Sequence, residues 1–138
     1  MSVRERRYAV VLVANLAIYG VYFAEALSQA GLADPQLDTG RLLSTIVSLI
    51  VVIIVGNIIV AILAPSDADA PADERDRLIG MRSDQIAGFV ASLGGSAGLV
   101  LAIMGFEVFW IANAVLAGLV AAEIIRSVVG IAGYRMGM

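Results

Sequence analysis

An acid and a base lie three residues apart in the last apolar stretch of the chain, where Glu123 is followed by Arg126. Residues at this spacing share one face of a helix. Ionisable groups inside a membrane segment are candidates for function, because they are expensive to bury there. Two interpretations follow. The pair is either an internal ion pair, with Arg126 reaching the lipid headgroups, or a site that carries protons or anions.

A second set of polar side chains marks the first apolar stretch. Asn15, Tyr19 and Tyr22 recur at helical spacing, and Asn57 lies in the second stretch at a similar depth. We expect these side chains either to hydrogen-bond between helices, at about 1 kcal/mol or less for each bond, or to line a polar pathway. Asn15 and Asn57 are expected to face each other.

The opposite ends of these stretches carry further polar groups. Asn113 and Glu107 lie where they can pair with Tyr22 or Glu25 of the first stretch. Two carboxylates in one place repel each other unless one is protonated or a cation intervenes. Arg41 is placed to be that cation.

The sequence gives little support for a catalytic site or for a bound cofactor. It contains neither Cys nor His, which removes thiolate and imidazole ligands for metals and haem, and the commonest general base near neutral pH. The run LGGSAG lacks the lysine of a phosphate-binding loop. No pair of nucleophile and base stands out. We therefore expect no cofactor, no metal and no enzymatic activity.

Four long apolar stretches must position these groups. Hydrophobic residues make up 60% of the 138 residues and charged residues 15%, against about 25% charged in soluble domains. Apolar runs of about 20 residues can cross a bilayer as helices. The predicted spans are 8–27, 42–63, 86–104 and 108–129. The predicted fold class is all-α, a polytopic membrane protein with a four-transmembrane-helix bundle in a single domain, 1–138.

The placement of arginine gives this bundle an orientation. All 9 basic residues are arginines, and eight of them fall on the same side of the four stretches. The positive-inside rule places that side in the cytoplasm, so both termini and the connection 65–85 are expected to be cytoplasmic, in a bacterial inner membrane. The net charge of −3 does not suggest nucleic acid. Membrane lipids are the expected partners, with the N-terminal arginines attracted to anionic lipid.

Small residues form stripes along the third and fourth stretches. The candidates for helix packing are Gly88, Ser92, Gly94, Gly95, Gly98, Ala114 and Gly118. Small side chains let helix backbones approach closely in lipid. We expect the stripes either to pack the third span against the fourth within one chain, or to form the interface of a homo-oligomer.

The connection 65–85 contains a cluster of charges. Its members are Asp73, Glu74, Arg75, Asp76 and Arg77. We expect the cluster to lie on a helix that runs directly into the third span. Asp69 is the expected N-cap of this helix and Pro71 falls in its first turn.

Two runs of the sequence resemble a group of small bacterial four-helix inner-membrane proteins of unknown function. The first, DERDRLIGMRSDQIAGFV, carries their DER-D/E-R motif before the third helix, and the second is the C-terminal AEIIRSVVGIAGYRMG. The matching positions are Asp73, Glu74, Arg75, Asp76, Glu123, Arg126, Tyr134, Arg135 and Gly137. The resemblance implies a fold and no mechanism. It also implies paired charges at the cytoplasmic end, where 73–76 would meet Arg126 and Arg135.

The sequence therefore predicts a small integral membrane protein with a non-enzymatic structural or regulatory role, which self-associates or acts as a subunit of a membrane complex. The alternative is a small transporter or channel that uses Glu123 and Arg126. A hydrated cavity shared by Glu123, Asn15 and Asn57 would favour transport. A dry bundle with small residues facing outward would favour association.

Overall fold

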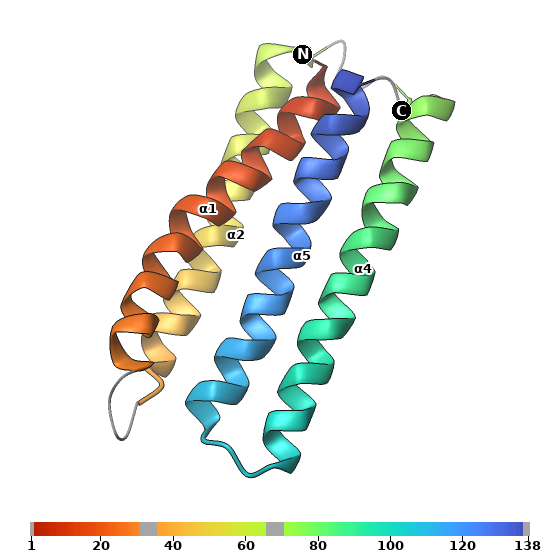
Figure 1. The fold of residues 1–138 in the computed structure, drawn as a ribbon. Helices are drawn as coiled ribbons and strands as arrows, with labels where there is room; N and C mark the ends of the chain where they lie inside the picture. Colours follow the sequence, from red (N-terminus) through yellow and green to blue (C-terminus); the bar gives the residue numbers. More distant parts are fainter. Residues whose placement is uncertain (1, 31–35, 66–70, 137–138) are drawn as a thin grey trace.

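The computed structural model describes residues 2–30, 36–65 and 71–136, and these residues are helical apart from their turns. Four helices follow one another: α1 (Val3–Ala30), α2 (Thr39–Leu63), α4 (Glu74–Ile103) and α5 (Val108–Met136). They run alternately in opposite directions, so that α1 begins and α5 ends at the same end of the bundle (Figure 1). The described ranges contain no strand. The predicted all-α, four-helix fold is confirmed.

All four helices are long and apolar enough to cross a membrane. The shortest, α2, has 25 residues, more than the roughly 20 that a 30 Å hydrocarbon core requires. It is also the most apolar, with a mean hydropathy of 3.2. The chain is therefore a multi-pass membrane protein. Each helix contains its predicted span, apart from Met104, which caps α4, and three of them extend several residues further into polar sequence.

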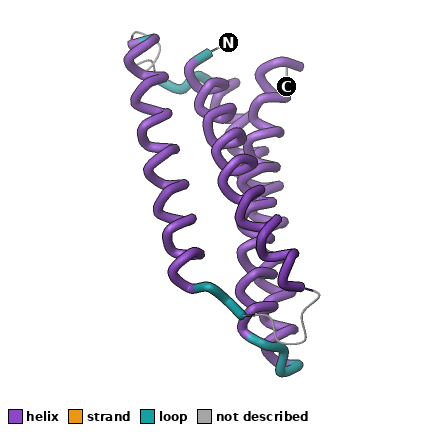
Figure 2. Tube along the Cα trace, turned by 90° about the vertical axis from the view of Figure 1, so that its left-hand side faces the viewer, coloured by secondary structure: helices purple, strands orange, loops and turns teal. Residues whose placement is uncertain are grey.

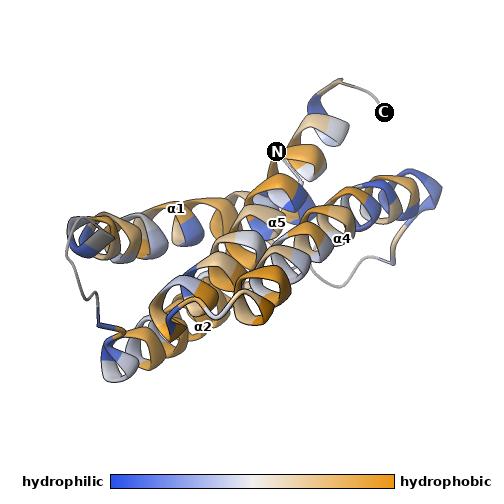
Figure 3. Ribbon diagram, turned by 60° about the horizontal axis from the view of Figure 1, so that its bottom comes forward, coloured by the Kyte–Doolittle hydropathy of each residue, from blue (hydrophilic) through white to orange (hydrophobic). Residues whose placement is uncertain are grey.

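The helices α1 and α5 form the centre of the bundle. α5 packs against α4 on one side and against α1 on the other, and α2 packs against α1. Among the described residues the backbone of α2 approaches no other helix, and Figure 2 shows α2 set apart from the rest. Apolar residues cover most of the length of the helices, and hydrophilic ones gather towards their ends (Figure 3). The outer helices α2 and α4 thus present much apolar surface to their surroundings.

The contact between α4 and α5 depends on glycine. Gly94 and Gly118 face each other, so that a Cβ built on either would overlap the Cα of the other. One turn further along α4, a Cβ on Gly98 would overlap the side chain of Val115. The small residues therefore bring the two backbones into contact, which is a common mode of helix association in lipid.

Aromatic residues of α1 form the core against α5. Tyr19 and Tyr22 are each 5% exposed and cluster with Leu116 and Val120. The ring of Phe23 packs edge-on against Tyr22, with the ring centroids 5.3 Å apart. The polar stripe predicted on α1 is thus largely buried against α5.

Polar side chains also join the helices at the end of the bundle where α1 ends and α2 begins. The Tyr22 hydroxyl donates a hydrogen bond of 2.9 Å to Oδ1 of Asn113, so this predicted pairing is confirmed. Arg41 forms an ion pair with Glu25. The expected cation therefore pairs with one of the two carboxylates, Glu25, and Glu107 takes no part in this ion pair.

The start of α4 differs from the prediction. Asp73 is the N-cap: its side chain accepts from the backbone N–H of Asp76 at 2.7 Å, and the Asp76 side chain accepts from the N–H of Asp73 at 3.1 Å. This reciprocal capping box begins the helix after Asp73, so the placement of Pro71 in the first turn was wrong. Asp69 lies outside the described residues. As predicted, the helix runs unbroken into the third span, and the turn after it uses Gly105 at a φ of 79°, which glycine adopts readily.

Candidate functional site

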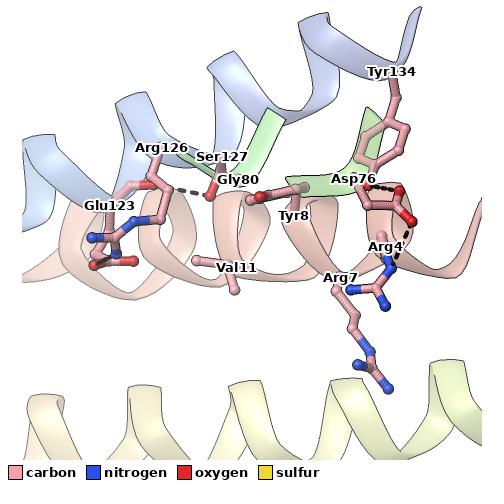
Figure 4. Close-up of a pocket in the computed structure, with 10 residues that line it drawn as sticks. All are labelled: Arg4, Arg7, Tyr8, Val11, Asp76, Gly80, Glu123, Arg126, Ser127 and Tyr134. Carbon is pink, nitrogen blue, oxygen red and sulfur yellow. Dashed lines mark hydrogen bonds and ion pairs between the residues drawn. The ribbon is translucent and has the colours of Figure 1, made fainter. Parts of the chain in front are cut away.

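An open cavity lined by several charged side chains lies between three helices at the end of the bundle where α1 and α4 begin and α5 ends, which we call the charged end. The cavity has a volume of about 280 Å³. Side chains from α1, α4 and α5 point into it (Figure 4). We call it the charged pocket, and its lining residues are Arg4, Arg7, Tyr8, Val11, Asp76, Gly80, Glu123, Arg126, Ser127 and Tyr134.

The predicted acid–base pair lies at one end of this pocket. Glu123 and Arg126 form an ion pair within α5. The Nε of Arg126 also donates to Oδ1 of Asp84, on α4, at 2.9 Å. The side chains of Glu123, Arg126 and Asp84 are 34–69% exposed. Each of the two ion pairs therefore contributes little to stability on its own. Together they fix Arg126 between two carboxylates and link α5 to α4.

At the other end of the pocket, Asp76 joins three helices. Its Oδ1 accepts a hydrogen bond of 2.5 Å from the Tyr134 hydroxyl, and its Oδ2 lies 3.3 Å from Nε of Arg4. The neighbouring Arg75 donates to the carbonyl oxygens of Gly133 and Tyr134, at 3.3 and 2.6 Å. These carbonyls belong to the last turns of α5, where side-chain donors replace missing helix partners.

A further ion pair joins the first turn of α1 to the end of α5. Glu5, whose side chain is 8% exposed, accepts from Nε of Arg135 at 2.8 Å. The expectation that 73–76 meets Arg126 and Arg135 was therefore wrong in its partners. The physical reason is that side chains from the first turn of α1 reach both helices: Arg4 pairs with Asp76 of α4, and Glu5 pairs with Arg135 of α5.

The remaining members of the predicted charge cluster lie outside the pocket. Asp73 caps α4. Glu74 and Arg77 are exposed. Four of the positions that carry the resemblance line the pocket, namely Asp76, Glu123, Arg126 and Tyr134, and Gly137 lies outside the described residues.

Tyrosine and serine form the wall between the two ends of the pocket. The ring of Tyr8 lies over Gly130, where a Cβ would overlap it, and its hydroxyl is 3.5 Å from Oγ of Ser83. Ser83 and Ser127 each donate to the carbonyl four residues earlier in their own helix, at 2.9 Å. Both hydroxyls are thus engaged by backbone.

Arg7 is the lining arginine without an acidic partner. Its Nε is buried and has no hydrogen-bond acceptor among the described residues, and the ion pairs of that part of the chain do not include it. Figure 4 shows its side chain leaving α1 towards α2, away from Asp76 and Glu123. Because a buried donor without an acceptor costs about 1–3 kcal/mol, Arg7 is well placed to bind an acceptor from outside the chain.

Glu123 also lines a second, mainly apolar cavity of about 190 Å³ between α1, α2 and α5. Asn15 and Tyr19 line it as well, whereas Asn57 does not. The amide of Asn15 donates to the carbonyl of Val11 at 2.8 Å, within its own helix. The Oδ1 atoms of Asn15 and Asn57 are both buried without a donor among the described residues. The expected pairing of these two side chains is therefore not formed.

The residues predicted to pack helices fall into two groups, one at the contact between α4 and α5 and one on the outer face of α4. The contact with α5 takes up Gly94 and Gly98 of α4 together with Gly118 of α5, and Ala114 is half-buried on α5. The outer face of α4 exposes Gly88, Ser92 and Gly95. No atom lies within 4 Å of a Cβ built on Gly88 or Gly95.

Sequence reasoning missed several residues of the site. It treated RERR as a basic patch and so overlooked Glu5, which is buried. It also overlooked the buried side of α4, although a signal was available. Asp76, Gly80, Ser83 and Ala87 recur at helical spacing, and this is the side that meets α1 and α5.

No group of three or more acidic side chains in the described residues is placed to hold a metal ion. Comparisons with protein-family models, with characterised proteins and with solved structures find no match. The function has therefore to be inferred from the chemistry of the molecule itself, namely paired charges at one end, a close glycine contact between helices and a pocket arginine, Arg7, whose buried Nε has no acceptor among the described residues.

Proposed function

We propose that the chain is a non-enzymatic structural membrane protein that self-associates, or joins a membrane complex, through the outer face of α4. The observation that carries this proposal is the exposed stripe of Gly88, Ser92 and Gly95, spaced by four and then three residues. Both glycines are open, with no atom within 4 Å of an added Cβ. Such a stripe lets a second helix approach closely in lipid.

The opposite face of the same helix supports the proposal. There, Gly94 and Gly118 already bring α4 and α5 into backbone contact, so this protein uses glycine for helix packing. The Ser92 hydroxyl donates to the carbonyl of Gly88 at 2.9 Å, so this hydroxyl is satisfied within its own helix. Leu99, 62% exposed, continues the stripe and can pack beside a helix that crosses there.

We further propose that the charged end faces the cytoplasm of a bacterial inner membrane. Three arginines near the N-terminus, three between α2 and the middle of α4 and two on α5 make up eight of the 9 basic residues. They belong to the segments that meet at the charged end (Figure 1). The positive-inside rule favours this orientation.

Native mass spectrometry in a mild detergent tests the association. We expect a defined oligomer, or a complex with another membrane protein, for the wild type. The double variant Gly88→Leu, Gly95→Leu should shift it to the monomer, because two large side chains keep the helices apart. Gly20→Leu is the matched control, since Gly20 is exposed on α1 with no atom within 4 Å of an added Cβ. A wild type that is monomeric at every concentration contradicts the proposal.

A small transporter or channel is the second candidate, and it rests on Glu123. This carboxylate lines both the charged pocket and the cavity of about 190 Å³ that contains Asn15 and Tyr19. It therefore stands between the charged end and the middle of the bundle. Ion flux into liposomes containing the purified protein tests this function. Flux that is lost in Glu123→Gln but kept in Glu107→Gln would support transport, whereas wild-type vesicles without flux would exclude it.

A further inference from the structure

The lining of the charged pocket has one more arginine than carboxylates, three against two. Asp76 is paired with Arg4 and Glu123 with Arg126, and Arg126 has a further acidic partner on α4. Arg7 is left with a buried Nε that lacks an acceptor among the described residues. An anion would therefore find its unpartnered donor at Arg7.

An apolar groove begins beside Arg7. It lies between α1 and α2, has a volume of about 580 Å³ and is lined only by apolar residues, among them Val10, Ala14 and Ala17 of α1 and Gly56 of α2. Val10 and Ala14 follow Arg7 by three and seven residues, so that the three share one side of the helix. Because the arginine side chain extends towards α2 (Figure 4), the cation stands at one end of the groove.

The groove is open to its surroundings. Val13 and Val52, which line it from the two helices, are 65% and 45% exposed. Gly56 keeps the two helices close at this point, since a Cβ there would overlap the Val10 side chain. A lipid acyl chain can therefore enter from the side and pack against the apolar residues of both helices.

A cation next to an open apolar groove has the chemistry of a phospholipid site. Guanidinium groups bind phosphate with paired hydrogen bonds, and basic pockets between membrane helices bind anionic headgroups. We propose that the chain binds one anionic glycerophospholipid, with its phosphate on Arg7 in the charged pocket and an acyl chain in the groove between α1 and α2. The site lies on α1 and α2, so it goes beyond the proposed association through α4 and does not depend on it.

Two other sources of the same chemistry make different predictions. Free inorganic phosphate would need the charged pocket but not the groove. Diffuse attraction of anionic lipid to the charged end would depend on the number of arginines and not on Arg7 in particular. The experiment therefore changes the pocket and the groove separately.

Native mass spectrometry of the delipidated full chain, titrated with phosphatidylglycerol or phosphatidylcholine, tests the arginine. We expect tighter binding of phosphatidylglycerol, and about a tenfold loss in Arg7→Gln, as for removal of a charge-assisted contact. Arg7→Lys keeps the charge without the paired donors and should lose less. Arg77→Gln is the control, because it makes the same charge change at an exposed position on α4 near the same end. Equal binding of the two lipids, or equal losses in Arg7→Gln and Arg77→Gln, would overturn the proposal.

Ala17→Phe tests the groove. Ala17 is exposed and lines it, so the phenyl ring would fill the space for the acyl chain. We expect about a tenfold loss of phosphatidylglycerol binding, with Ala97→Phe, at an exposed position on α4, as control. If inorganic phosphate displaces the lipid from the wild type and Ala17→Phe binds lipid normally, the site takes a free anion and the lipid proposal is wrong.

Thermal unfolding separates binding from folding. Phosphatidylglycerol should stabilise the wild type by mass action and should not stabilise Arg7→Gln. In lipid-free detergent, Arg7→Gln should unfold no earlier than the wild type, because the buried Nε of Arg7 has no acceptor among the described residues to lose. A variant that is destabilised without lipid, yet stabilised by it as the wild type is, would show that Arg7 has only a structural role.

Discussion

Tyr134 and Asp76 bind each other across the charged end: the phenol hydroxyl near the end of α5 donates to the carboxylate in the first turn of α4 at 2.5 Å. The same carboxylate lies 3.3 Å from Arg4 of α1. Asp76 also completes the capping box that starts α4. One side chain thus begins a helix and fixes its position against two others.

Tyr134→Phe should lower the free energy of unfolding by about 1–3 kcal/mol, because it removes a hydrogen bond to a charged acceptor. Denaturation by SDS in mixed micelles measures this change. Tyr8→Phe is the matched control in the same pocket. Its hydroxyl lies 3.5 Å from Ser83, so we expect a much smaller loss. Equal losses in the two variants would mean that the contact with Asp76 contributes nothing specific.

The glycine contact between α4 and α5 should be intolerant of any side chain. In Gly94→Ala, the new Cβ would overlap Gly118, and backbone cannot move aside as a side chain can. We expect a loss of about 1–3 kcal/mol, typical of overpacking, in the same SDS titration. Gly20→Ala, at an open position, should be neutral or slightly stabilising because alanine favours helix. A neutral Gly94→Ala would show that the helices are further apart than the structure has them.

The sequence alone was sufficient to predict the elements but not all of their contacts. Apolar length determined the four helices, since only helices satisfy the backbone in lipid. Depth along the helices placed Asn113 near Tyr22 and Glu25, and the structure selects Tyr22 as its partner. The division of the glycines on α4 could not be predicted in this way. Gly94 and Gly95 are adjacent, and which of them meets α5 depends on the rotation of the helix.

The charged end was harder to predict for the same reason. Arg126 and Arg135 both have acidic partners, but the choice of Asp84 and Glu5 depends on where the start of α1 lies relative to α4 and α5. The distribution of arginines predicts which end of the bundle faces the cytoplasm, through the positive-inside rule. It does not give their pairing, because several acids at this end lie within reach of each arginine.

Arg135→Leu should be more harmful than its exposed position suggests. The Arg135 side chain is 63% exposed, but its partner Glu5 is only 8% exposed. Removal of the arginine leaves a buried carboxylate without its cation, which costs more than the ion pair contributes. We expect a loss of about 1–3 kcal/mol. Arg41→Leu is the control, since its pair with Glu25 is 40% and 49% exposed and should contribute about 1 kcal/mol or less.

The double variant Glu5→Leu, Arg135→Leu tests the cause of that loss. If the damage comes from the unpaired carboxylate, removal of the carboxylate as well should recover much of the stability. If the two substitutions add, the side chains act independently and the pair does not determine the position of α1 against α5.

Tyr22→Phe examines whether a hydrogen bond inside the bundle stabilises it. The variant removes the donor of the 2.9 Å bond to Asn113, while the Asn113 amide keeps its own bond to the carbonyl of Phe109 at 2.7 Å. Because such bonds in membrane proteins contribute about 0.6 kcal/mol on average, we expect a loss below about 1.5 kcal/mol in SDS titration. Tyr19→Phe is the matched control, since Tyr19 is equally buried. A larger loss would mean that Asn113 cannot find a substitute donor once the tyrosine hydroxyl is removed, and that this contact also determines how α1 is rotated against α5.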